Sequence, residues 1–383
     1  MLKVAVGHSN DPDSQEAIDE ILDQCRAELG EHQPQAGILF AAVDFDHKLI
    51  LQQIDRAFPG LDLIGGTTDG ELSSVLEFQQ DSLTLMLFSS DDIEIRAGVG
   101  RQISRSPVDI AHQAVEAVQQ QLTQPVQLCI AIPESLTTSM VSILRGIEAA
   151  IGSIPVFGGA TADQWQYKCT HQFFRTDVLS DAVPFLLFAG NLAFSYGVAG
   201  GWYPIGRRSQ ITRAEKNIIY EIDHKPALEL YRHYFDGSDP GDIHPLAVFP
   251  PGESRFFLRG ALDYDAESGT ITVSGDVPEE ATVQFTDASM EDVVAASQQA
   301  FAEALNQYPG GHPDAALFFS CAWRRQILGT RANEEYQAIT RSLKHALLSC
   351  GFYTYGEIAP LRDDGKTFFH NTTFVTLLMG SQS

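Results

Sequence analysis

The chain has 383 residues, of which 44% are hydrophobic and 20% charged, and this composition is typical of a folded protein with two or three structural units. Acidic residues number 50 against 25 basic ones, and the formal charge of −25 argues against binding to nucleic acid or anionic membranes. Five cysteines without a close pair argue against a disulfide framework. Because there is no apolar signal segment and no apolar run long enough to span a bilayer, we expect a cytoplasmic protein.

Three glycine-rich stretches divide the chain into related copies. They read GGTTDGEL (65–72), GGATADQW (158–165) and GFYTYGEI (351–358). Aligned on their first glycine, they share a threonine at Thr68, Thr161 and Thr354. The recurrence of such a pattern indicates internal repetition. The alignment pairs Gly70-Glu71 with Gly356-Glu357 and puts Asp163-Gln164 in the middle copy.

The same order of elements surrounds each stretch. In each copy we expect a strand, a helix, the bend and a final strand, preceded by one more strand and helix, because apolar residues recur with the matching periods. The expected copies span about 3–90, 93–191 and 281–380, with an insertion at about 192–280. We therefore predict a mixed α/β fold: three strand–helix–strand–helix–strand–strand units that form packed sheets flanked by helices.

The leading helix of each copy has a similar start signal. An oxygen acceptor stands three residues before an acid in Asp13/Glu16, Ser106/Asp109 and Ser289/Asp292. This spacing resembles a capping box. Pro107 fits the first helical position, where its missing N–H costs little.

Several separated motifs resemble the FIST-domain family. They are 201–235 (GWYPIGRRSQITRAEKNIIYEIDHKPALELYRHYF), which resembles the junction between the two FIST halves, and 351–360 with 369–380, which resemble the closing motif of the C-terminal half. The resemblance covers nearly the whole chain and implies a FIST N-terminal half at 1–225 and a C-terminal half at 226–383. Position 66 is glycine where the family often has cysteine.

The resemblance implies a sensory module of a signalling system. Small ligands such as amino acids have been proposed for FIST domains, and stand-alone chains of this size look like the NosP group of haem-binding nitric-oxide sensors. It therefore implies haem b as a cofactor and a separate signalling partner such as a histidine kinase. An organic metabolite bound without haem is the alternative. Self-association into a homo-oligomer is compatible with either version.

The third copy carries the richest set of candidate ligand-binding side chains. Strand ends tend to line ligand crevices in layered α/β folds, so these segments are expected to meet at one end of a sheet. An arginine within an apolar run needs an acceptor if it is buried, which Glu357 or a ligand carboxylate could supply. The candidate ligand-binding residues are Arg259, Cys321, Arg324, Tyr353, Tyr355, Glu357, His370, Asn371 and Thr68.

A haem iron needs a His, Cys, Met or Tyr ligand, and the two best-placed histidines are His370 and His171, which stand among phenylalanines. For any one of these residues, a purely structural role is the competing interpretation. Catalysis is not expected because the common hydrolase and metalloprotease motifs are absent. A thiol mechanism at Cys321 is the enzyme alternative.

Overall fold

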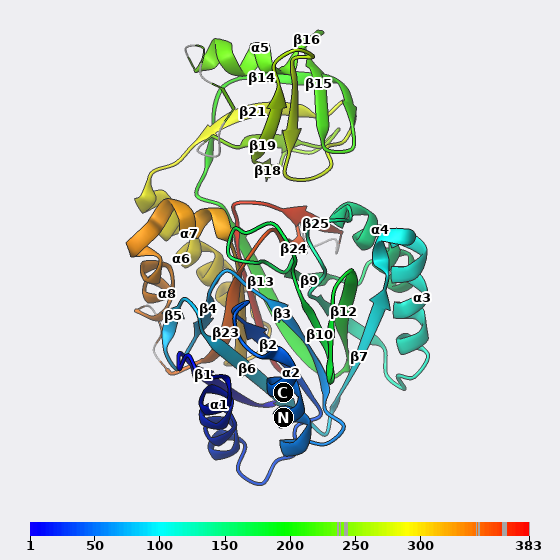
Figure 1. Cartoon of the computed structure of the whole chain (residues 1–383), viewed down its shortest axis with the longest axis vertical. Coiled ribbons are helices and arrows are strands. Elements are labelled where there is room, and N and C mark those ends of the chain that lie inside the picture. Colours follow the sequence, from blue (N-terminus) through cyan, green and yellow to red (C-terminus); the bar gives the residue numbers. More distant parts are fainter. Residues whose placement is uncertain are drawn as a thin grey trace.

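A computed structural model describes residues 1–235, 237, 239–240, 244–341, 343, 345–361 and 366–382. Two bodies are visible in Figure 1: a large one built from the three copies, and a smaller one above it, which we call the insert (residues 200–288). The large one, residues 1–199 and 289–382, is called the three-copy body. The predicted α/β class and the flanking of sheets by helices are confirmed.

The three copies have the same order of elements. The first consists of β1 (Lys3–Ser9), α1 (Ser14–Leu29), β2 (Ala36–Ala41), α2 (His47–Ala57), β3 (Asp62–Thr67), β4 (Glu71–Ser73), β5 (Glu77–Gln79) and β6 (Leu83–Ser89). The second consists of β7 (Ile93–Arg101), η1 (Ile103–Arg105), α3 (Pro107–Gln119), β8 (Val126–Ala131), α4 (Met140–Ile151), β9 (Val156–Gly159), β10 (Gln172–Phe174), β11 (Asp177–Leu179) and β12 (Ala182–Gly190).

The third copy is interrupted by the insert. It consists of β13 (Leu192–Ala199), α6 (Met290–Gln307), β22 (Ala315–Cys321), α7 (Ala322–Leu328), η2 (Gly329–Arg331), α8 (Asn333–Thr340), β23 (Leu348–Thr354), β24 (Glu357–Pro360), β25 (Thr367–His370) and β26 (Phe374–Ser381). The insert consists of β14 (Tyr203–Glu215), β15 (Ile218–Ile222), β16 (Lys225–Pro226), α5 (Ala227–Tyr234), β17 (Leu246–Phe249), β18 (Phe257–Arg259), β19 (Ala261–Asp265), β20 (Thr270–Val273) and β21 (Thr282–Asp287).

The copies exchange their hairpins in a ring. The first sheet has the order β1-β6-β2-β3-β10-β11, the second β7-β12-β8-β9-β24-β25, and the third β13-β26-β22-β23-β4-β5. Each sheet therefore has four strands of its own copy and a two-stranded hairpin from another copy. The hairpin of the second copy joins the first sheet, that of the third joins the second, and that of the first joins the third. We expect such an exchange to couple the folding of the three copies.

The position of β13 corrects the expected copy boundary. We expected the insertion to begin near residue 192 and the third copy near residue 281. The structure instead pairs β13 with β26 in the third sheet, so residues 192–199 are the first strand of the third copy. The insert falls between this strand and the leading helix α6. Its own sheet pairs β14 with β21 and β15 with β20. The expected unit also lacked the exchanged hairpin, because strands of three or four residues have almost no periodic signal.

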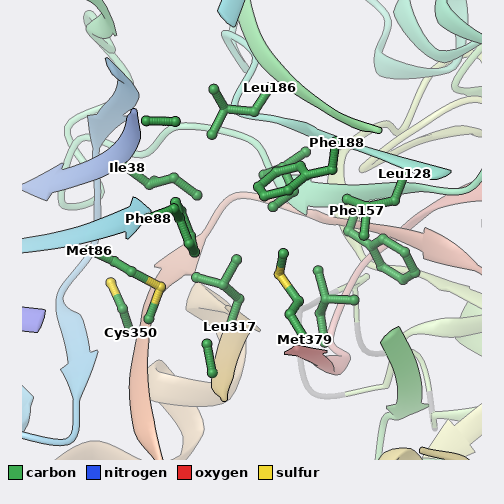
Figure 2. Close-up of a cluster of buried hydrophobic side chains, with 14 of the residues drawn as sticks. Ile38, Met86, Phe88, Leu128, Phe157, Leu186, Phe188, Leu317, Cys350 and Met379 are labelled. Carbon is green, nitrogen blue, oxygen red and sulfur yellow. The ribbon is translucent and has the colours of Figure 1, made fainter. Parts of the chain in front are cut away.

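The three sheets share one apolar core. Their inner faces contribute side chains to a single cluster, part of which is drawn in Figure 2, with Ile38, Leu186 and Leu317 from the three copies. The outer faces carry separate clusters under helices: α1 and α2, α3 and α4, and α6 and α8. Both faces of each sheet are thus buried, which explains why the central strands read as continuous apolar runs rather than alternating patterns.

The helix starts follow the capping signals in two copies of three. Asp13 accepts the amides of Gln15 and Glu16, and Ser289 forms a full capping box with Asp292. Ser106 makes no side-chain cap bond to the backbone of α3 and donates its hydroxyl to the Asp109 carboxylate at 2.6 Å instead. Within the part of the chain described, no helix combines the length and apolarity needed to cross a membrane.

A glycine at the end of β3 tests this architecture. A Cβ added at Gly65 would lie 1.9 Å from the carbonyl oxygen of Leu39 on the neighbouring strand, and φ there is +156°. Because the obstacle is backbone, Gly65→Ala should cost about 3 kcal/mol or more in denaturant unfolding, if the variant folds at all. The matched control is Gly60→Ala, where φ is also positive but no atom lies within 4 Å; its expected cost is about 1 kcal/mol. Equal costs would contradict the close packing at β3.

Candidate functional site

The three glycine-rich bends meet at the centre of the three-copy body. Each bend leaves the end of a parallel strand pair and leads into a hairpin of another sheet. Because the bends cross at this point, their backbones hydrogen-bond to one another rather than to a ligand. The pairwise amide-to-carbonyl bonds are Ala162 to Thr67 (2.8 Å), Asp69 to Tyr353 (2.9 Å) and Ala160 to Gly356 (2.9 Å).

One buried position repeats behind each bend. Three strand pairs show it: Glu71 lies opposite Phe352, Gln172 opposite Gly66, and Glu357 opposite Gly159. In each pair the second residue directly follows the first glycine of a bend. Gln172, and not Gln164, is therefore the spatial counterpart of the two glutamates. The sequence alignment misses this because the middle bend is longer by eight residues.

The repeated position holds a neutral group. Burial raises the pKa of Glu71 and of Glu357 to about 8, so both are largely protonated at pH 7. Glu71 accepts hydroxyl hydrogens from Thr68 and Ser82, and Glu357 accepts the amide (3.0 Å) and hydroxyl (2.6 Å) of Thr373. The middle copy uses glutamine, the neutral isostere of a protonated glutamate. These side chains stabilise the junction of the bends.

Arg324 and Tyr353 belong to a second buried network. Glu335 on α8 accepts Nε of Arg324 at 2.9 Å and the hydroxyl of Tyr353 at 2.6 Å, and none of these side chains is exposed. Arg324 also donates to the carbonyls of Gly200 and Val293. A buried arginine with this number of acceptors is structurally satisfied. Glu335 was not predicted, because an acid on a short amphipathic helix gives no signal that it points inward.

Cys321 lies beside Glu357 and is 1% exposed. Burial, followed by the nearby Glu357 carboxyl group, raises the pKa of the Cys321 thiol well above its usual range. A neutral, enclosed thiol is a poor nucleophile. Thr68 is likewise fully buried, against Glu71.

An aromatic cluster covers the junction of the bends. Trp165 packs edge-on against Trp323 at 4.5 Å between ring centroids, and Tyr167 stacks on Tyr355 at 5.1 Å. The segment that carries Trp165 and Tyr167 has left-handed backbone at Gln164, Trp165 and Tyr167. Three non-glycine residues in this conformation within four positions indicate local strain, which is concentrated at functional sites.

Asp163 and Asp69 anchor this cluster. Asp163 accepts the Tyr355 hydroxyl at 2.8 Å and the amides of residues 167–169. Asp69 pairs with Arg325 at 2.5 Å and accepts Nε1 of Trp165 at 2.9 Å. Burial, only partly offset by Arg325, raises the pKa of Asp69 to about 6. Neither acid was predicted as part of the site.

A cavity of about 550 Å³ opens beside the aromatic cluster, between the insert and the three-copy body. We call it the cleft. The second copy provides the loop before α4, the third copy provides aromatic and amide side chains, and the insert provides the opposite wall. The residues that line it include Ser135, Ser139, Val141, Tyr167, Lys216, Leu262, Ser274, Asp276, Trp323, Tyr355, Phe369 and Asn371. Its volume lies in the range of small-molecule sites, about 300–1,000 Å³.

The floor of the cleft holds the two bodies together. Nη1 of Arg259, on the insert, donates to the Phe369 carbonyl (3.0 Å) and to Oδ1 of Asn371 (3.1 Å). Ser274 also donates to Asn371 at 2.8 Å. Ser139, the N-cap of α4, donates to Asp276 at 2.8 Å. We call these contacts the latch. Of the two acceptors suggested for Arg259, Glu357 is replaced by carbonyl and amide oxygens in the structure, and a ligand carboxylate stays a prediction.

The two candidate haem ligands lie in different parts of the fold: His370 ends β25, and His171 directly precedes β10. His370 is 1% exposed, and its Nε2 lies 3.0 Å from the Ala359 carbonyl. This contact leaves Nδ1 as the ring nitrogen for an iron. Burial lowers the pKa of His370 to about 4. His171 is partly buried, with its ring 5.7 Å from that of His47.

The structure thus separates the predicted residues into groups. Tyr355 and Asn371 line the cleft, and Arg259 forms its latch. Glu357 and Cys321 lie together behind it, Arg324 and Tyr353 share Glu335, and Thr68 belongs to the junction. The cleft residues contributed by the loop at 135–141 and by Lys216 and Asp276 were not predicted, since nothing in the sequence shows that the insert folds back over α4.

Two family models match most of the chain. The model of the FIST N domain matches residues 35–225, and that of the FIST C domain matches residues 227–360. An uncharacterized protein of Mycobacterium tuberculosis is 25% identical over 401 residues, which cover 97% of this chain and 98% of that protein. An uncharacterized protein of Mycobacterium bovis is 23% identical over 97% of both chains. The cyanuric acid hydrolase of A. caulinodans aligns over the full length of both chains with 9% identity and a TM-score of 0.40, which is too low to transfer anything.

The neutral position behind the bends gives a pH prediction. The pKa of Glu71 is about 8 in the folded chain against 4.5 for the free side chain, so its contribution to stability is complete below pH 4.5 and is lost as the pH rises to 8. The slope is at most about 1.4 kcal/mol per pH unit for each such group. Glu71→Gln should therefore raise the midpoint of urea unfolding at pH 8 and change it little at pH 5. Gln172→Glu should lower the midpoint of urea unfolding at pH 8 and change it little at pH 5. If either variant has the same effect at both pH values, the assignment of a neutral group to this position is wrong.

Proposed function

Because the chain belongs to the FIST family, whose domains sense ligands in signalling, we propose that it is a small-ligand sensor whose ligand binds in the cleft. The observation that carries this proposal is the position of the cleft between two bodies that are joined by the latch. A ligand there contacts residues of both bodies at once. Its binding free energy therefore depends on how the bodies are placed, which is the requirement for a ligand to shift a conformational equilibrium.

The walls of the cleft indicate how the two bodies respond. Tyr167 on the three-copy body and Leu262 on the insert are about half exposed, at 51% and 52%. Large apolar side chains on opposite walls of a cavity lose exposure when a ligand fills it or when the walls approach. The chain enters the insert at Gly200-Gly201, and φ of Gly201 is +93°. We infer that ligand binding draws the insert towards the three-copy body about this entry segment.

The chemistry of the cleft favours a polar organic ligand. Lys216 is exposed at one side, and Asp276 lies at the floor, so the cleft offers both signs of charge. Ser135 has a buried hydroxyl oxygen without a hydrogen-bond partner among the described residues. Tyr355 and Trp323 supply aromatic surface. This combination supports the organic-metabolite version of the function, with an amino acid as one example, and requires no haem.

The haem-dependent nitric-oxide sensor is the alternative proposal. It rests on the resemblance to the NosP group and on His370, which lines a separate cavity of about 400 Å³. One ring nitrogen of His370 is already hydrogen-bonded to a carbonyl. The two histidines therefore support haem binding less well than the cleft supports binding of an organic ligand. Haem b, if bound, would supply the nitric-oxide site. In both versions the signal passes to a separate signalling protein, for which a histidine kinase is our proposal. A thiol enzyme at Cys321 has the least support, because the thiol is buried and neutral.

A ligand screen tests the cleft. A ligand found by thermal shift should stabilise the chain by about 2.7 kcal/mol at a concentration of about 100 Kd. Ser135→Phe, which fills the cleft, should weaken its binding at least about tenfold in calorimetry, equal to about 1.4 kcal/mol. Ser268→Phe is the matched control, because Ser268 lines a larger open groove at the far end of the insert. Equal effects of the two variants would place the ligand outside the cleft.

Absorption spectroscopy tests the haem alternative. After reconstitution with haem, the organic-ligand version predicts no Soret band from a stoichiometric complex. The haem version predicts a band that His370→Ala or His171→Ala abolishes, depending on which residue binds the iron. His112→Ala is the control for a histidine without an expected role. A Soret band that persists in both single variants would exclude these histidines as ligands.

A further inference from the structure

An apolar cavity adjoins the cleft, between α4 and the insert. Its volume is about 300 Å³, and it shares Val141, Asp276 and Phe369 with the cleft. We call it the apolar branch. Leu144, Phe257, Val277 and Phe368 are among the residues that line it. A cavity of about 150 Å³ already binds benzene when its walls are apolar. The branch is therefore large enough for an aromatic ring or a short alkyl chain.

A buried cation lies in the wall of this branch. Arg259 is 2% exposed, and its guanidinium lies over the ring of Phe257 at 4.2 Å. All its acceptors among the described residues are neutral oxygens: the carbonyls of Leu258, Phe369 and Asp276 and the amide of Asn371. Nη2 donates to the Asp276 carbonyl alone, which leaves its second hydrogen for another acceptor. Burial lowers the pKa of Arg259 to about 9, so the group is charged at pH 7.

The local charge favours an anion. Arg145 and Lys366 also line the branch, as do the acids Glu148 and Asp276. With Arg259, the lining thus has three basic and two acidic side chains, whereas the whole chain has a formal charge of −25. Burial raises the pKa of Glu148. The Asp276 carboxylate accepts Ser139 and only partly offsets the burial of Arg259, and among the described residues no carboxylate oxygen bonds directly to the guanidinium. A buried charge without a directly bonded carboxylate is costly, and an anionic ligand would offset more of this cost.

From this arrangement we propose that the site takes a carboxylate with an apolar body, the body in the apolar branch and the carboxylate at Arg259. This inference rests on the proposed sensing function and narrows its ligand class. The same guanidinium forms the latch to Phe369 and Asn371. Binding of a carboxylate to Arg259 therefore acts directly on the contact that holds the insert to the three-copy body.

A series of carboxylates tests the proposal on the full chain. Calorimetry with acetate, butanoate, hexanoate and 3-phenylpropanoate should show affinity that rises about fourfold for each buried methylene group. The uncharged amide of 3-phenylpropanoate should bind at least about tenfold more weakly than the acid, because a charge-assisted bond to Arg259 is lost. Equal binding of acid and amide would overturn the assignment to Arg259.

Three variants locate the binding. Arg259→Lys keeps the charge but loses the planar fork, and it should weaken the acid while leaving the amide nearly unchanged. Val277→Phe fills the branch and should weaken both apolar compounds while acetate binding stays unchanged. Arg255→Lys is the matched control: Arg255 also reaches from the insert to a carbonyl, that of Leu361, but lies outside the branch. Carboxylate binding that all three variants leave unchanged would overturn the proposal.

The outcome also separates this inference from the function on which it rests. If a polar metabolite binds and Ser135→Phe abolishes its binding while no carboxylate of the series binds, the apolar-carboxylate inference fails and the sensing function stands. If neither the series nor the metabolite screen gives a ligand that Ser135→Phe affects, both fail. Unfolding curves of each variant without ligand identify any loss of binding that comes from a damaged latch.

Discussion

The crossing of three backbone bends at one point is the constraint on which the rest of the structure depends. Where β3 ends, the strand beside it is so close that Gly65 has no room for a Cβ atom, and the bends bond to one another through their amides and carbonyls. The hairpin that follows each bend pairs with a strand in the sheet of another copy. Because no copy completes its own sheet and all three contribute to the shared apolar core, we expect the core to form only when all three are present. The neutral carboxyl and amide groups behind the bends form hydrogen bonds within this junction without placing a charge in it.

The cleft is a consequence of breaking this symmetry. The third copy alone carries an insert, and the middle bend alone is lengthened. The structure brings these two irregular segments to the same cavity, where they line opposite walls. The lengthened bend supplies Tyr167 in strained backbone, and the insert supplies the latch. A regular three-copy body without these additions would have no such cavity. The proposed ligand site is therefore formed mainly by the insert and the lengthened middle bend, the two segments that depart from the repeat.

Much of the fold was predictable because it depends on local patterns. The repeated glycines, the apolar runs and two of the three capping signals gave the copies and their elements, since periodicity and capping act over a few residues. The hairpins and β13 were missed or assigned to the wrong segment because pairing partners lie far away in the chain, as Cys350 and Ser73 do. Of the site, Tyr355, Asn371 and Arg259 were anticipated, whereas Ser135, Lys216 and Asp276 were not.

The sequence by itself determined the class of elements, the repetition and the family, because these are properties of residue order. Only the tertiary structure decided what the polar residues do. In the sequence Arg259 and Arg324 are both arginines in apolar surroundings. In the structure Arg324 pairs with Glu335, whereas Arg259 has only neutral hydrogen-bond acceptors. That difference arises because α8 turns an acid inward at one site, while at the other the insert supplies only carbonyl oxygens and the segment at 369–371 supplies a carbonyl and an amide oxygen. Whether a buried charge is compensated depends on which groups lie close to it in space, and the order of residues alone does not give these distances.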